Sequence, residues 1–197
     1  MRDTTTDEAL LELIASHDEK ALEALHRRYY KRLCDFAYHI LNSLPITEEV
    51  VSDVFLQLWL KRSDITIRTK VKSYLFSAVR NQALNTLKKE DQPWEDIETA
   101  HLPPTTQAPS TINDLEYREF EQEVDTLLRT LPEQRQLIFR LNRFEGLRYK
   151  EIAQILGISS NTVQNQMVAA VKHLVSHYPN LVARWESSLS LLLLLLS

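Results

Sequence analysis

Only two of the 197 residues are glycine, and both lie in one short stretch, at positions 146 and 157. Tight hairpins need glycine where the backbone takes a positive φ, so a chain this poor in glycine has few ways to build sheets. The residues that dominate instead are Leu, Ala, Glu, Gln, Lys and Arg, which all favour helices. The sequence therefore predicts an all-α fold.

A proline-rich stretch divides the chain. Residues 91–113 interrupt every helical pattern and collect prolines at 93, 103, 104 and 109, together with Asp, Thr and Ser. Such a composition is typical of a flexible linker. We therefore expect two small helical domains, at 1–90 and 113–180, joined by an acidic, Pro-rich linker at 91–112 and followed by a Leu-rich tail at 181–197.

Apolar residues recur with helical spacing on both sides of this linker. The first domain is predicted to hold helices at 7–16, 18–43, 47–63 and 69–89, with Asp18 and Thr47 as start signals. The second is predicted to hold helices at 113–130, 132–144, 148–156 and 159–178, with Pro132 in a first turn.

Three features indicate a cytoplasmic setting. The single cysteine, Cys34, lies in an apolar helical context and is expected to be a buried apolar residue; no intrachain disulfide can form. The first residues lack the apolar core of a signal peptide. The apolar run Leu191–Leu196 is far shorter than the ~20 residues that span a bilayer.

Positive charge is concentrated in one segment although the whole chain has a formal net charge of −4. Between residues 61 and 89 eight basic side chains face a single acid, Asp64, which gives a local charge of +7. Contact with a polyanion depends on such local patches rather than on the total charge. The segment is therefore a candidate nucleic-acid surface, and a merely solvated face is the alternative.

The stretch that contains both glycines has the spacing of a helix-turn-helix. With Tyr149 as the start, Ala153 falls where two crossing helices need a small side chain, and Gly157 falls where the turn needs a left-handed backbone. Val163 then anchors the second helix in the core, and Ser159 is placed to cap it.

The second helix of this motif has two distinct faces. Its apolar face carries Val163, Met167, Ala170, Val171 and Leu174. Asn161, Asn165 and Lys172 lie opposite, with Thr162 and Gln166 beside them and Gln164 at the edge. Because Asn and Gln can pair bidentately with adenine in the major groove, this face is predicted to read DNA. A solvated polar face is the alternative.

The helix expected at 47–63 has apolar residues on both sides. Its broad inner face is formed by Val50, Val51, Val54, Phe55 and Leu58. Leu56 and Leu60 lie one turn apart on the outer side, flanked by Asp53 and Gln57. An exposed apolar pair needs an explanation, which is either a partner helix or a locally wider core.

Taken together, these motifs resemble the extracytoplasmic-function (ECF) sigma factors, which are promoter-recognition subunits of RNA polymerase. The resemblance covers residues 21–174. "TEEVVSDVFLQLWLKR" and "YLFSAVRNQALNTLKK" are similar to sigma region two, and "LPEQRQLIFRLNRFEGLRYKEIAQILGISSNTV" is similar to region four. The "RFEGLRYKEIA" wording and the Leu-rich ending resemble the Bacteroidetes branch, which is often paired with membrane-anchored anti-sigma proteins.

The resemblance implies three binding surfaces and no catalytic, metal, cofactor or small-molecule site. The first surface docks core RNA polymerase at the β′ clamp helices and consists of Asp53, Leu56, Gln57, Trp59 and Leu60. The second domain contacts the β flap of polymerase. The second surface grips and opens the downstream promoter element with the loop "RSDITIRTK" and the helix that follows it. The predicted contacts of this helix are Lys70, Lys72, Arg80, Asn81, Asn85, Lys88 and Lys89. Tyr74 and Phe76 are candidates for stacking on a flipped base, with a place in the ordinary core as the alternative. The third reads the upstream element with Arg148, Lys150, Ser160, Asn161, Thr162, Gln164, Asn165, Gln166 and Lys172.

The second helix of the motif departs from the family in charge. Family members usually carry several basic residues there, whereas here Lys172 is the one firm charge. We therefore expect weak binding by this domain alone, with charge supplied by Arg140, Arg143, Arg148 and Lys150 nearby, or by the first domain and polymerase. The tail is expected to pack on protein, with an anti-sigma factor or a membrane surface as alternatives.

Two other functions fit parts of the sequence. An ordinary helix-turn-helix regulator would bind duplex DNA without polymerase. A di-metal helical-bundle enzyme would use a Glu-x-x-His spacing, which occurs at Glu23–His26 and Glu98–His101. The second of these pairs lies in the linker, and His26 is expected to be a surface or capping histidine.

Overall fold

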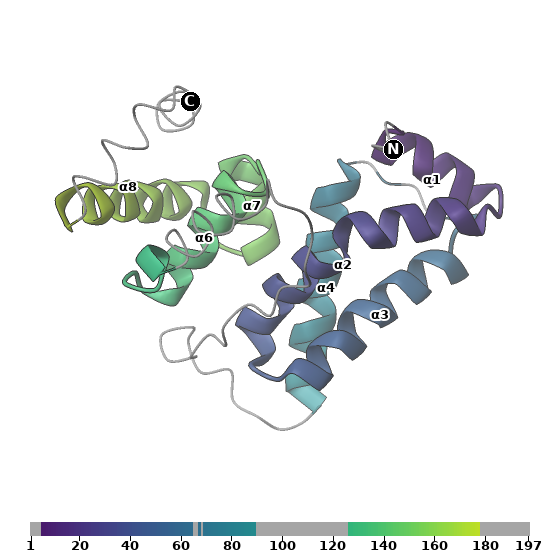
Figure 1. Cartoon of the computed structure of the whole chain (residues 1–197), viewed down its shortest axis with the longest axis horizontal. Coiled ribbons are helices and arrows are strands. Elements are labelled where there is room, and N and C mark those ends of the chain that lie inside the picture. Colours follow the sequence, from purple (N-terminus) through teal and green to yellow (C-terminus); the bar gives the residue numbers. More distant parts are fainter. Residues whose placement is uncertain (1–4, 65–66, 68, 90–125, 178–197) are drawn as a thin grey trace, which may run out of the picture. The chain divides into compact units, whose positions relative to one another are not determined.

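The computed structural model describes residues 5–64, 67, 69–89 and 126–177. Every regular element within these ranges is an α-helix, which confirms the all-α prediction (Figure 1). The helices form two compact units, one of α1–α4 and one that holds α6, α8 and the larger part of α7. The linker at 91–112 and the tail at 181–197 lie outside the described residues, so their boundaries stay predictions.

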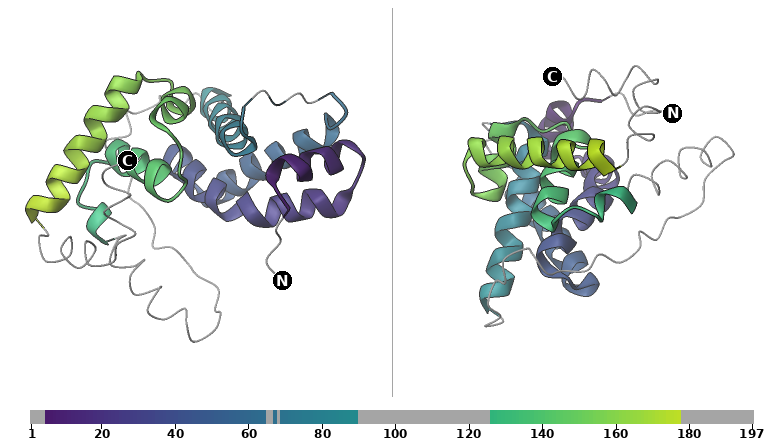
Figure 2. Two further views of the ribbon diagram at one scale, coloured as in Figure 1. Left: turned by 90° about the horizontal axis from the view of Figure 1, so that it is seen from above. Right: turned by 90° about the vertical axis from the view of Figure 1, so that its left-hand side faces the viewer.

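The first unit is built around its longest helix. Its elements are α1 (Asp7–Ala15), α2 (Glu19–Leu41), α3 (Leu44–Leu60) and α4 (Val71–Lys89). Helix α2 packs against each of the other three (Figures 1 and 2). It contributes Leu25, Leu33 and Phe36 to the core, and the Phe36 ring meets the edge of Phe76 from α4 at 5.1 Å between centroids.

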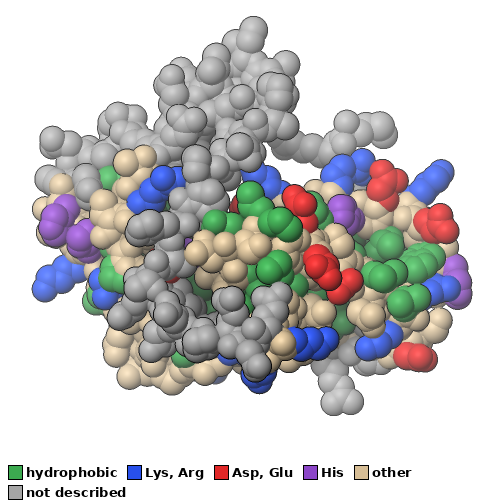
Figure 3. All heavy atoms as spheres, turned by 90° about the horizontal axis from the view of Figure 1, so that it is seen from below, with side chains coloured by type: hydrophobic (Ala, Val, Ile, Leu, Met, Phe, Trp, Pro, Cys, Tyr) green, Lys and Arg blue, Asp and Glu red, His purple; other side chains and the backbone are tan. Residues whose placement is uncertain are grey.

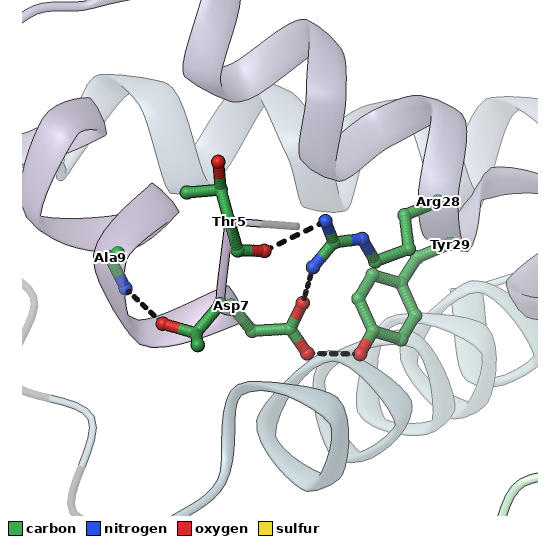
Figure 4. Close-up of polar contacts among 6 residues, drawn as sticks. Thr5, Asp7, Ala9, Arg28 and Tyr29 are labelled. Atoms are coloured by element: carbon green, nitrogen blue, oxygen red, sulfur yellow. Dashed lines mark hydrogen bonds and ion pairs between the residues drawn. The ribbon is translucent and has the colours of Figure 1, made fainter. Parts of the chain in front are cut away.

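Polar contacts fix α1 to α2 (Figure 4). The Asp7 carboxylate accepts hydrogen bonds from the Arg28 guanidinium and from the Tyr29 hydroxyl. A second Arg28 nitrogen donates to the Thr5 carbonyl at 2.9 Å, and the Thr6 hydroxyl caps α1 by accepting from the Ala9 N–H at 3.2 Å. Burial, reinforced by the Asp7 carboxylate, raises the pKa of Tyr29 above its ordinary value. The phenol therefore stays protonated and can donate.

Helix starts in this unit follow their capping signals, with one correction. The Asp18 carboxylate accepts from the Lys20 N–H at 2.8 Å, as predicted for a cap. The start predicted at Thr47 is wrong, because α3 begins one turn earlier, at Leu44. Proline lacks an N–H that a first turn does not use, so Pro45 sits inside the helix rather than before it.

The second unit contains α6 (Glu133–Arg143), α7 (Tyr149–Leu156) and α8 (Ser160–His177). Helix α8 packs on α6, and Val163, Met167 and Leu174 of α8 are buried, as are Leu137 and Leu141 of α6. Pro132 caps α6 instead of occupying its first turn. Most of the helix predicted at 113–130 lies outside the described residues; residues 126–128 are helical.

Gly157 has the left-handed backbone that the sequence predicts, and Gly146 has a left-handed backbone as well. Gly146, between α6 and α7, has φ 65°, and Gly157, at the end of α7, has φ 69°. A Cβ added to Gly146 would meet nothing within 4 Å. Its requirement for glycine therefore comes from the backbone conformation alone and not from crowding.

We expect Gly146→Ala to lower the free energy of unfolding of the second unit by about 1 kcal/mol, because a left-handed conformation costs an L-residue about that much. Gly146→Asn should cost less, since Asn tolerates this region of φ. Urea unfolding followed by circular dichroism measures both. Gln164→Ala, at an exposed position of α8, is the control and should stay within about 0.5 kcal/mol. Equal losses for Ala and Asn would contradict the backbone explanation.

His26 makes the stability of the first unit depend on pH. Its ring lies 4.5 Å from Tyr30 and 4.7 Å from Phe55 of α3, between centroids. Burial lowers the pKa of His26 below its ordinary 6.5. The unfolded chain therefore binds the proton more readily, and the free energy of unfolding falls as the pH drops through 6.5.

We expect His26→Phe, which keeps an aromatic ring at this position, to weaken that loss of stability on acidification. Urea unfolding of the full chain between about pH 7.5 and about pH 5 tests this, since that range covers the titration of histidine. Identical slopes in the parent and the variant would show that His26 is not the responsible group.

Candidate functional surfaces

The outer face of α3 carries an exposed leucine pair. Leu56 and Leu60 expose 51% and 60% of their surface, while Val50, Val54 and Leu58 on the same helix are buried. A locally wider core does not cover the pair among the residues that the structure describes. Figure 3 shows one face of the molecule, on which hydrophobic side chains lie at the surface between charged ones. The leucine pair is therefore available to a partner.

The other members of the predicted docking set flank the leucines. Gln57 is exposed, whereas Asp53 and Trp59 are half-buried. The Asp53 carboxylate accepts a long hydrogen bond, 3.5 Å, from the Gln82 amide of α4. The Arg62 guanidinium lies 4.4 Å from the Trp59 ring centroid and donates to the Trp59 carbonyl at 2.7 Å. Trp59 therefore forms a rigid edge beside the leucines, held from one side by a cation–π contact.

Helix α4 separates its core from its basic side. Val71, Leu75, Val79 and Ala83 are buried. The exposed predicted contacts are Lys70, Asn81, Asn85, Lys88 and Lys89, and the half-buried ones are Lys72 and Arg80. Exposed Asn81, Asn85 and Lys88 follow helical spacing, so they share one side of the helix.

The two aromatic candidates near the basic segment differ in burial. Phe76 exposes 1% of its surface and packs on Phe36, so it belongs to the core and offers no face to a base. Tyr74 is half-buried, and burial raises its pKa. The loop "RSDITIRTK" is described only in part, because residues 65, 66 and 68 lie outside the described ranges.

The helix-turn-helix has the geometry that the sequence predicts. Ala153 and Val163 are buried, at 7% and 0% exposure. The chain reverses at Gly157, where the Ile158 N–H donates to the Ala153 carbonyl at 3.1 Å. The Ser159 hydroxyl accepts from the Thr162 N–H at 3.0 Å and so caps α8. These contacts define both the start and the direction of α8.

Helix α8 presents most of its predicted reading residues to the outside. The exposed ones are Ser160, Asn161, Gln164, Asn165 and Lys172. Thr162 and Gln166 are half-buried and already have partners within the unit. The Thr162 hydroxyl contacts the Ser159 hydroxyl at 2.8 Å, and the Gln166 carbonyl oxygen accepts from Arg135 of α6 at 3.0 Å.

Sequence reasoning missed Val168. This valine exposes 62% of its surface and follows Asn161 and Asn165 along the same side of α8, with Lys172 one turn further on. Its apolar character gave no signal of exposure; the helical spacing relative to Asn161 and Asn165 would have revealed it. An exposed methyl-bearing side chain in such a row is suited to the thymine methyl group in the major groove.

Two cations lie at the start of α7. Arg148 and Lys150 are both exposed, and the Arg148 N–H donates to the Glu151 carboxylate at 2.7 Å, which satisfies one of the free donors of the first turn. The Glu151 carboxylate already occupies the positive end of the helix, so it is the two exposed cationic side chains that favour an anion such as a backbone phosphate.

The residues proposed for a di-metal enzyme are engaged elsewhere. His26 is half-buried and packs on the rings of Tyr30 and Phe55, and Glu23 pairs with Arg27 at 4.0 Å. Glu98 and His101 lie outside the described residues. Cys34 is half-buried rather than buried, and burial raises the pKa of its thiol to about 11. Among the described residues no helix is long and apolar enough to cross a membrane.

Comparison with known proteins gives matches in both units. The family model of sigma-70 region 2 matches residues 25–92, and that of sigma-70 region 4 matches residues 121–174. The ECF RNA polymerase sigma-E factor of Haemophilus influenzae is 27% identical over 187 residues, covering 86% of this chain and 94% of that protein. The ferric citrate uptake sigma factor FecI of Escherichia coli is 26% identical over 151 residues, covering 77% and 87%.

A solved structure shares the fold. It is that of CnrH in complex with the cytosolic domain of CnrY, with a TM-score of 0.54 and 19% identity, covering 86% of this chain and 95% of that one. The assignment to the Bacteroidetes branch is not tested by these relatives and stays a prediction. Because both sigma-70 regions match in their proper order and the relatives match over most of their length, the chain belongs to the ECF sigma factors, the promoter-specificity subunits with which RNA polymerase initiates transcription.

Proposed function

We propose that α3 is the element that docks this sigma factor on core RNA polymerase, at the β′ clamp helices. The exposed pair Leu56 and Leu60 carries the proposal, with Gln57 beside it and Asp53 and Trp59 at its edges. An apolar pair one turn apart, presented by a helix that is itself locked into a core, suits a helix–helix interface in which a few anchors dominate the affinity.

The basic side of α4 is proposed to hold the downstream promoter element. Lys70, Lys88 and Lys89 are exposed and supply charge for phosphates, while Asn81 and Asn85 supply polar groups between them. Lys72 and Arg80 lie at the border of the core and also contribute to the local +7 of residues 61–89. Tyr74 remains the aromatic candidate for a flipped base.

The upstream element is proposed to be read by α8 in the major groove. Asn161, Gln164 and Asn165 provide the bidentate amides, Val168 provides an apolar contact, and Lys172 provides a phosphate contact. Ser160 lies at the start of this face, and Arg148 and Lys150 place a second phosphate site at the start of α7. Gln166 and Thr162 support this face through their contacts inside the unit.

Other partners follow from the same function. The second unit is proposed to contact the β flap of polymerase, and the acidic linker to follow the path of transcript exit. An anti-sigma protein, of the membrane-anchored kind common in the Bacteroidetes branch, is the proposed regulator; CnrH, whose fold this chain shares, was solved with the cytosolic domain of CnrY. The protein itself is proposed to act in the cytoplasm and to catalyse no reaction.

A stand-alone regulator is the alternative, and one experiment separates it from this proposal. In run-off transcription with purified core polymerase and a library of promoters, a sigma factor yields transcripts, because it binds polymerase and directs initiation. A regulator that binds duplex DNA alone would give specific binding without polymerase and no transcript.

We expect Leu56→Glu combined with Leu60→Glu to weaken holoenzyme assembly by about thirtyfold or more, because a loss of about 2 kcal/mol is typical when interface anchors are removed. Binding of labelled chain to core polymerase measures this. Leu44→Glu is the matched control: Leu44 lies on the same helix, is 57% exposed, and is about 18 Å away. Equal weakening by the control, or none by the double variant, would contradict docking by this pair.

We expect Asn161→Ala and Asn165→Ala each to reduce discrimination at one base pair of the upstream element by about 1–3 kcal/mol, because a bidentate amide–adenine pair carries that much. Transcription from the promoter library by the reconstituted holoenzyme reports the change position by position. Gln166→Ala is the control, since its amide is already held by Arg135 at 3.0 Å. A loss of discrimination as large for Gln166 as for Asn165 would refute this division of roles.

A further inference from the structure

A groove runs along α8 beside its proposed reading face. It has a volume of about 490 Å³ and is lined on α8 by Val168, Val171 and Val175, with Tyr149 of α7 and Arg143 of α6 on the opposite wall. Val168 and Val175 are both largely exposed. A hollow of this size with an aliphatic floor marks a surface that gains stability when another apolar group covers it.

The polar groups around the groove also favour a peptide occupant. The charged residues that line it are Arg143 and Lys172, and no carboxylate is among them. A peptide segment lying in the groove would bring backbone carbonyls, which can accept hydrogen bonds from the two cationic side chains that line it.

We propose that the occupant is the chain's own leucine run, Leu191–Leu196. Helix α8 ends at His177, half a turn beyond Val175, so the following segment begins at one end of the groove. Thirteen residues, 178–190, precede the run and can span roughly 40 Å, whereas Val168 and Val175 are only about 10 Å apart along α8. The tether is therefore long enough to return the leucines along the whole groove.

Docking of the run covers part of the reading face. Val168 and Lys172 line the groove and also belong to the outer row of α8. Promoter DNA and the leucine run therefore compete for the same two side chains, and the tail acts as an autoinhibitory segment. This second step rests on the proposed reading role of α8, whereas the docking itself does not. Because the two binding events exclude each other, DNA bound to α8 weakens docking of the tail by the same factor by which the docked tail weakens DNA binding.

Spin labelling tests the docking in the full chain. Cys34 is the single cysteine, so Cys34→Ala combined with Ser190→Cys places one nitroxide directly before the leucine run. We expect strong, concentration-independent broadening of the methyl signals of Val171 and Val175. Leu192→Asp with Leu195→Asp, or Val175→Asp in the groove, should each abolish it. Absent broadening overturns the proposal, as does broadening that grows with protein concentration, which indicates a second copy, or that needs added lipid vesicles.

DNA binding tests the competition separately. Removal of residues 187–197 should tighten binding of the polymerase-free chain to its selected promoter DNA several-fold, because a short tether holds the competing run at an effective concentration near ~1 mM. Unchanged affinity overturns the competition. If the full-length chain with core polymerase gives no transcripts, the proposed function fails instead, while the spin-label result still decides the docking.

Discussion

An α-helix can bury only one face, and each surface assigned to a function in this protein is the opposite face of a helix that is locked into a core. In α3 the buried Val54 and Leu58 fix the rotation of the helix and so determine that its leucine pair points outward. In α8 the buried Val163 and Met167 do the same for the row of amides. The binding groups are therefore held at defined angles by apolar contacts that take no part in binding, which is the arrangement that a precise site requires.

The second unit adds polar contacts that fix α8 along its axis. Gly157 allows the reversal after α7, and the Ser159 cap sets the first residue of α8. Further along, Arg135 of α6 holds Gln166. A reading helix that could slide or roll by one residue would present a different row of side chains to the bases. These contacts, together with the buried core, leave α8 a single register relative to α6.

The helices and their buried faces agree closely with the sequence-based predictions. The predictions fail where a contact depends on residues that are distant in the chain. Periodicity predicted the buried faces of α3 and α8 because burial repeats with the helical turn, with the exception of Val171, which is half-buried. It did not show that Gln166 already has a partner, because Arg135 lies 31 residues away in the chain. It passed over Val168 because an apolar residue gives no sign of exposure when the neighbouring core residues are also apolar. Thr47 does not mark the start of α3, because Pro45 fits in the first turn of the helix, where its missing N–H is not needed.

The distribution of charge explains why the two units need to act together. Lys172 is the one Lys or Arg between residues 159 and 177, so α8 can discriminate bases while gaining little from phosphate contacts. The segment 61–89 has the reverse character, with a local charge of +7 and few amides. Each unit alone lacks what the other has. In the proposed complex, polymerase holds α3 and places both units on one promoter, so that the second contact is intramolecular and two weak affinities multiply through the effective concentration. A reading helix with a single Lys, which the leucine run is proposed to cover, is consistent with this logic, because such a helix has little affinity for DNA before the enzyme adds its own contacts.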